Sequence, residues 1–125
     1  MATMGNTNRE GFGNVADGQI TISHYAIVFR YGTGAAIVFV SQALETPRTL
    51  AVGEPMEFPV NSFVYTLPSG DGTSAGAKAL IDAMIAQHGN PTILLGTGAM
   101  GDLANANEVT DSGYARQIME MTTAL

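Results

Sequence analysis

The chain has 125 residues, a net charge of −6, five Lys and Arg residues and no Cys. This length supports one domain, and the scarcity of cations and the lack of Cys argue against a nucleic-acid surface, disulfides, thiolate nucleophiles and Cys-based zinc sites. The longest apolar stretch, 35–40, is too short to span a bilayer and residues 1–18 contain no apolar signal core, so we expect no membrane partner and a protein made in the cytoplasm.

The first 18 residues are rich in Gly and Asn, and their sizeable apolar groups are Phe12 and Val15. They show neither a helical nor a strand period. We therefore expect an extended N-terminal arm over 1–18, followed by a single β-rich domain over 19–125. A disordered tail is the alternative, because an arm becomes ordered only where a partner buries it.

Two apolar runs are typical of strands. Residues 20–29 alternate at first and then become continuously apolar, as in a strand that is buried at one end. Two glycines within 31–34 predict a hairpin turn, and the β-branched and aromatic residues of 35–44 predict the second strand. Pro47 then breaks a strand or confines it to the edge of a sheet.

Further strands are expected on both sides of the chain's one helical pattern. Apolar residues alternate between 56 and 67 and change phase at Asn61 and Ser62, which predicts a bulge or bend. Near the end of the chain, 92–95 predicts a short apolar strand and 114–122 a last strand of mixed character. A long loop rich in Gly and Asn lies between these two strands.

One segment has the spacing of an α-helix, from about residue 75 to residue 88. Gly89 is placed as a left-handed stop, and Pro91 prevents the helix from resuming. Five residues form its apolar stripe: Ala77, Leu80, Ile81, Met84 and Ile85. Strands and helix together predict a mainly β fold, an antiparallel β-sandwich or jelly-roll-like domain with one packed α-helix.

The sharpest chemical pattern is a GxGxxG sequence at Gly96, Gly98 and Gly101, directly after an apolar run. In a dinucleotide-binding unit these glycines need a helix behind them and a second parallel strand, and residues 102–109 have no helical period. We therefore expect a turn-rich loop and no cofactor. A small module that binds an anionic ligand with this loop is the distant alternative, and it requires a helix beginning near Asp102.

The other reactive side chains have structural interpretations. His24 lies in a predicted strand with no motif that pairs it with a carboxylate, and His88 ends the predicted helix, where the helix dipole favours a cation. Asp102, Glu108 and Asp111 do not follow the spacing of an EF-hand loop, so we expect a solvated acidic loop and no metal site. No GxSxG, HExxH or P-loop sequence is present, and we predict a protein that is not an enzyme.

Residues 107–117, NEVTDSGYARQ, resemble a pattern of small phage structural proteins of the tail-fibre, head-fibre and capsid-decoration kind. In those proteins a Gly-rich loop and a TEV stretch precede GGYARQ, which leads into a strand. The run from Gly113 to Gln117 matches this motif. Those proteins also carry a short amphipathic helix and an apolar strand upstream, which correspond here to 77–87 and 92–95.

A second block, 22–29 with its hairpin and the alternating segment 54–67, is similar to a terminal block of the same family. In those relatives it follows the GYARQ block, whereas here it precedes that block. The chain therefore looks like a circular permutation, with 68–74 as the joining segment. Permutation leaves packed contacts intact when the two termini lie close together.

Within the motif, a strand that starts at Tyr114 places Tyr114 and Arg116 on one face. Arg116 is one of five fixed cations, so we expect it to pair with a carboxylate in the fold or across a subunit contact. The candidate interaction residues are Arg9, Phe12 and Val15 of the arm, and Tyr114 and Arg116 of the motif.

The low charge bears on function. Only 13% of residues are charged, about half the usual share, so a neighbour can cover the surface at little cost in desolvation. A soluble monomer with a neutral polar surface is the alternative. Together with the resemblance, the low charge favours a phage virion protein that decorates or cements the capsid surface. Its expected partners are the major capsid protein and copies of itself in a closed oligomer such as a trimer. A tail-associated or fibre-base protein is the second expectation, ranked lower because no long repeat is present.

Overall fold

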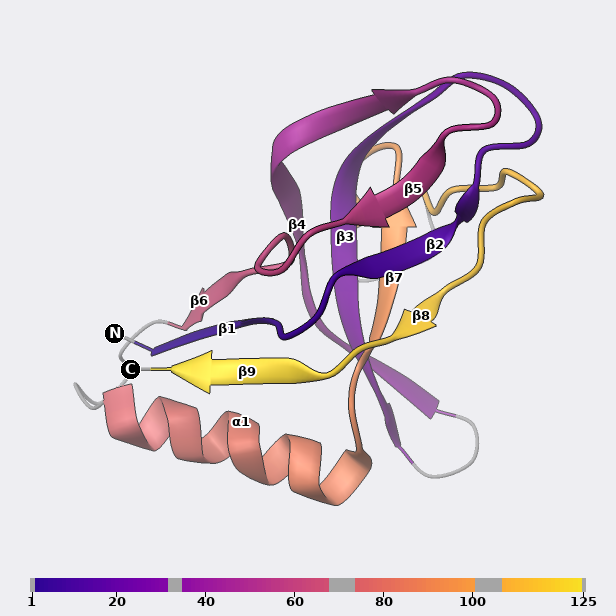
Figure 1. The fold of residues 1–125 in the computed structure, drawn as a ribbon. Coiled ribbons are helices and arrows are strands. Elements are labelled where there is room, and N and C mark those ends of the chain that lie inside the picture. The colour runs from indigo at the N-terminus through magenta and orange to yellow at the C-terminus, as the bar shows by residue number, and fades with distance from the viewer. Residues whose placement is uncertain (1, 32–34, 68–73, 101–106, 125) are drawn as a thin grey trace.

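The computed structural model describes residues 2–31, 35–67, 74–100 and 107–124. Within these ranges the chain is mainly β, with three antiparallel sheets and one helix, which confirms the predicted fold class (Figure 1). The strands are β1 (Ala2–Asn6), β2 (Glu10–Asn14), β3 (Ile20–Tyr31), β4 (Ala35–Leu50), β5 (Pro55–Phe58), β6 (Tyr65–Leu67), β7 (Thr92–Gly96), β8 (Gln117–Ile118) and β9 (Met121–Ala124). The helix is α1 (Ser74–His88), and it is too short to cross a membrane.

The sheets have the strand orders β6-β1-β9, β2-β5 and β4-β3-β7-β8. Strand β3 pairs with β4 on one side and with β7 on the other. Its residues 25–29 are all buried, which explains why this stretch is continuously apolar. The core around it includes Tyr25, Phe12, Phe58 and Phe63, whose rings meet mostly edge to face.

Strand β4 is longer than the predicted 35–44, because Pro47 does not end it. The β3–β4 register runs from Ile22↔Arg48 to His24↔Ala43, so residues 44–47 bulge opposite a single residue of β3. Strand β4 is also the edge of its sheet. Proline is tolerated there, since it cannot donate to a ladder but no partner strand needs its N–H.

The extended arm expected over 1–18 is wrong for the described part of that segment. Strand β1 pairs with both β6 and β9, and β2 pairs with β5. Met4 and Phe12 are fully buried. The many Gly and Asn residues of this segment leave it without the apolar alternation that predicts a strand. Its partner strands lie more than 40 residues away in the chain, so no local sequence pattern could indicate them.

The two ends of the chain run side by side as one antiparallel ribbon (Figure 1). Thr3 pairs with Ala124 and Asn6 with Met121, and the Thr7 N–H then donates to the Glu120 carbonyl at 3.0 Å. The same register reaches Ala115, whose N–H donates to the Phe12 carbonyl at 2.9 Å. We call residues 3–14 and 113–124 the terminal ribbon.

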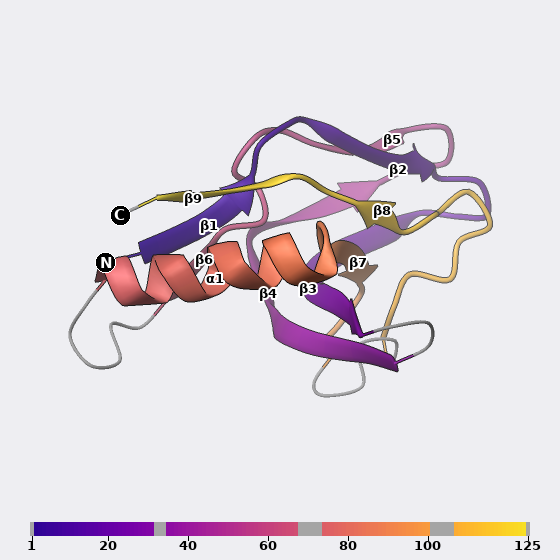
Figure 2. The same ribbon diagram turned by 90° about the horizontal axis from the view of Figure 1, so that it is seen from below.

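Helix α1 matches the predicted 75–88 within one residue and lies against β1, β9 and β3 (Figure 2). Ile81 is fully buried, while Met84 and Ile85 pack against the core. The prediction that Leu80 faces the core is wrong, since its side chain is 63% exposed. The buried face of α1 lies about one residue further along the sequence than the predicted stripe and is centred on Ile81 and Ile85. The side chain of Ala77 lies outside the described part of the structure.

Gly89 ends the helix as predicted. Its φ of 81° lies in the left-handed region, and its N–H donates to the Ile85 carbonyl at 2.8 Å. The bend predicted at Asn61 and Ser62 is also present, with Asn61 at a φ of 62°. The last predicted strand, 114–122, is instead divided into β8 and β9, because the chain changes partner from β7 to β1.

We expect a circular permutant to fold, in which a short Gly-rich linker joins Leu125 to Met1 and the chain is opened between Leu67 and Ser74. The terminal ribbon already places the two ends together, so the linker needs to close only a hairpin. Circular dichroism and thermal unfolding would then show a cooperative β fold with a melting temperature within about 10 °C of the parent. A control permutant opened at Ala26, in the middle of the central strand, should not fold, and equal behaviour of both permutants would contradict the ribbon.

Candidate functional site

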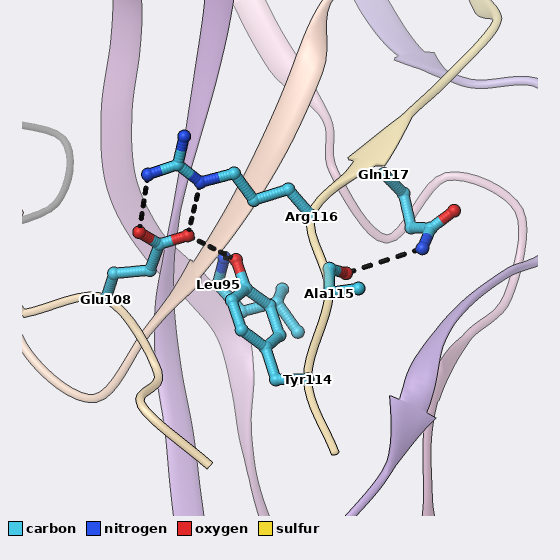
Figure 3. Close-up of polar contacts among 6 residues, drawn as sticks. All are labelled: Leu95, Glu108, Tyr114, Ala115, Arg116 and Gln117. Atoms are coloured by element: carbon cyan, nitrogen blue, oxygen red, sulfur yellow. Dashed lines mark hydrogen bonds and ion pairs between the residues drawn. The ribbon is translucent and has the colours of Figure 1, made fainter. Parts of the chain in front are cut away.

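The motif segment 113–117 lies beside β2 rather than in a strand of its own. Strand β8 begins only at Gln117, so the predicted strand start at Tyr114 is wrong. Tyr114 and Arg116 nevertheless point to the same side, since both bind Glu108 (Figure 3). Glu108 is part of a strand-like bridge with Gly96 at the end of β7.

Glu108, Tyr114 and Arg116 form a hydrogen-bonded cluster. Arg116 donates to both carboxylate oxygens of Glu108, from Nε to Oε2 and from Nη2 to Oε1, each at 2.8 Å. The Tyr114 hydroxyl donates to Oε2 at 2.7 Å and accepts the N–H of Leu95 at 3.1 Å. The prediction that Arg116 pairs with a carboxylate is therefore confirmed, and the partner lies within the same chain.

The cluster holds Glu108 in its charged form. Partial burial acts to raise the pKa of Glu108, but the hydrogen bonds from Arg116 and Tyr114 outweigh it and lower that pKa below its ordinary value. The hydrogen bond to Glu108 raises the pKa of Arg116, and burial raises the pKa of Tyr114. At neutral pH the site is therefore an ion pair with a neutral phenol, an arrangement suited to holding segments together.

Gly113 allows the motif to touch β2 directly. A Cβ on Gly113 would lie 1.8 Å from the carbonyl oxygen of Asn14, and a Cβ on Gly13 would lie 1.9 Å from the carbonyl oxygen of Gly113. Gly13 also has a φ of 103°, in the left-handed region. The two backbones can approach this closely only because both positions are glycine.

Asp17 and Asp111 connect the same two segments, and each carboxylate binds the segment that carries the other. Asp111 accepts the N–H groups of Ala16 and Asp17 at 2.8 and 2.9 Å, and these bonds, the one to Asp17 foremost, lower its pKa. In return, Asp17 accepts the N–H of Ser112 at 2.7 Å and its hydroxyl at 2.6 Å. We call this pair of carboxylates the aspartate clasp.

Sequence reasoning missed the aspartate clasp. Asp111 also accepts the N–H of Gly113 at 2.8 Å, a local turn that the sequence DSG typically forms. That signal was available from the sequence. The bonds to Ala16 and Asp17 were not, because they span 95 and 94 residues and follow no local period.

The candidate interaction residues of the expected arm belong to two environments. Phe12 is fully buried and stacks on Tyr114, with ring centroids 6.2 Å apart, and Val15 is 2% exposed. Both serve the core of their own chain. Arg9 is exposed and forms an ion pair with Glu57, so it is the arm residue that faces solvent. The structure thus joins Phe12 to the motif and leaves Arg9 apart from it.

The glycine-rich loop begins as a hairpin. The N–H of Thr97 donates to the Asn107 carbonyl and that of Val109 to the Leu95 carbonyl, each at 2.9 Å. Residues 95–97 and 107–109 thus face each other as strands do. Gly101 and Asp102, where a helix would have to begin for anion binding, lie outside the described residues.

The remaining candidates have structural roles where the structure describes them. The Nδ1 atom of His24 and the hydroxyl of Ser23 are 2.7 Å apart, and His88 ends α1 as expected. The expectation of a solvated acidic loop is wrong for Glu108 and Asp111, whose side chains are largely buried and engaged in the bonds given above, while Asp102 is not described. No group of three or more His, Asp or Glu residues that could hold a metal occurs among the described residues.

Comparisons with protein-family models, with curated proteins and with solved structures find no match to this chain.

Gly113→Ala should destabilise the fold, because the new methyl group would overlap the Asn14 carbonyl and force the ribbon apart. We expect a loss of about 2–3 kcal/mol or more in the free energy of unfolding, measured by urea titration. Gly11→Ala is the matched control, since a Cβ there meets nothing within 4 Å. An effect of the same size for both variants would show that the close backbone approach is unimportant.

Glu108→Gln should lower the free energy of unfolding at pH 7 by about 1–2 kcal/mol, since Arg116 is partly exposed and its pair is partly screened. The folded pKa of Glu108 is depressed, so its contribution is complete above its unfolded pKa of about 4.3 and is lost as the pH falls through the folded pKa. The difference between variant and parent should therefore shrink below about pH 4 in urea titrations. A difference that stays constant down to pH 2 would contradict this assignment, and Glu120→Gln, an exposed carboxylate, serves as the control.

Proposed function

We propose that this chain is a structural protein of a bacteriophage particle that decorates or cements the capsid surface. The main support is a surface with few charges, part of which are already neutralised within the chain. Of the four Lys and Arg residues whose side chains the structure describes, three form internal ion pairs: Arg9 with Glu57, Lys78 with Asp82, and Arg116 with Glu108. Covering such a surface costs little in charge desolvation.

The similarity of the segment 113–117 to phage structural proteins agrees with this proposal. The motif has a structural role, because Gly113, Tyr114 and Arg116 help to hold the two ends of the β domain together. A domain whose two ends are fixed to each other resists fraying, which is useful in a particle exposed to harsh conditions. The extended arm expected over 1–18 is not part of the proposal, since residues 2–6 and 10–14 belong to strands of the sheets.

Binding to capsids tests the proposal. The purified chain should cosediment with undecorated capsids of its phage in a saturable manner, and the bound fraction should change little between about 0.05 and 0.5 M salt, because few charges take part. Heat-unfolded chain is the control for adsorption. Failure to bind capsids would refute decoration, and binding to isolated tails would support the tail-associated alternative in its place.

A further inference from the structure

A cleft of about 310 Å³ lies between the bulged part of β4 and the turn that follows β5. Leu44 and Phe58 are buried and give it an apolar floor, while Val60 at its rim is 51% exposed. Two charged residues of β4, Glu45 and Arg48, also line it. The cleft is therefore apolar inside and carries one charge of each sign at its border.

Arg48 is held in place but its charge is not neutralised. Its guanidinium lies over the Phe58 ring, 5.1 Å from the centroid, and its Nη1 donates to the Glu57 carbonyl. It forms no ion pair with any described carboxylate, unlike the other Lys and Arg residues whose side chains are described, Arg9, Lys78 and Arg116. A positioned cation of this kind is ready to receive a carboxylate from outside.

Glu45 supplies the complementary charge. It is exposed, lies three residues before Arg48 on the same strand, and forms no ion pair with a described cation. Because one strand carries both signs at this spacing, the patch is complementary to a copy of itself turned by 180°. An axis between Thr46 and Pro47 would place Glu45 of each copy opposite Arg48 of the other.

We propose that this cleft is a two-fold contact between two copies of the chain. The β4 edges run antiparallel, Glu45 of each copy pairs with Arg48 of the other, and Val60 of each copy is covered. Side chains rather than a backbone ladder carry the contact, because Pro47 has no N–H and the strand bulges at this point.

Charge explains why two copies meet at this place. Each copy has a net charge of −6, so most approaches are repulsive. The two charged residues that line the cleft, however, are one of each sign, Arg48 and Glu45. The copies therefore meet where the lining residues carry no net charge. This contact gives a dimer rather than the expected trimer, and it does not rest on the capsid proposal.

Sedimentation velocity of the isolated chain over a range of concentrations tests the contact. We expect a reversible species with twice the 13.0 kDa chain mass. Arg48→Glu and Glu45→Arg should each weaken the dimer at least about tenfold, and the double variant E45R/R48E should restore it, because the exchanged charges again face each other.

The two single variants separate specific pairing from general repulsion. R48E makes the chain more negative and E45R makes it less negative, so net charge alone would weaken the first dimer and strengthen the second. Lys78→Glu, which changes the net charge as R48E does but lies on α1, should dimerise like the parent. Thermal unfolding checks that each variant is folded. A chain that stays monomeric at all concentrations, a stronger dimer for E45R, or a double variant without rescue would each overturn the proposal.

Discussion

The antiparallel pairing of the two chain ends is the constraint on which the rest of this structure depends. The N-terminal half of the terminal ribbon supplies β1 to one sheet and β2 to a second, and the C-terminal half supplies β9 to the first and β8 to the four-stranded sheet. All three sheets are thus joined through one ribbon. Separating the chain ends would expose Met4 and Phe12 and remove the ribbon that connects the three sheets.

The segment 113–117 and the residues that it contacts secure this ribbon. Gly113 permits the closest backbone approach, Tyr114 stacks on Phe12, and Arg116 neutralises Glu108. The aspartate clasp fixes the neighbouring turn to residues 16 and 17. Each of these contacts is internal to the chain. The segment 113–117 therefore serves the architecture of the domain itself.

Internal ion pairing also shapes how the molecule meets other molecules. Arg116 is neutralised by Glu108 and Lys78 by Asp82, which additionally accepts the hydroxyl of Thr123 at 2.6 Å. Among the described residues, the charges without an ion pair are few, and most of them are acidic. Contacts with neighbours must then rely on shape and on the few charges left over, of which Arg48 is positioned by Phe58.

The sequence by itself determined the elements whose information is local. The stripe around Ile81 and the stop at Gly89 specify α1, and the apolar run of 25–29 specifies the central strand, because neighbouring residues decide a helix or strand period. Only the tertiary structure decided that residues 2–6 and 10–14 are strands, that Leu80 faces outward, and that Asp111 binds residues 16 and 17. These features depend on partners far away in the chain, and a segment of Gly, Asn and Thr with no apolar period becomes a strand only when another strand satisfies its backbone.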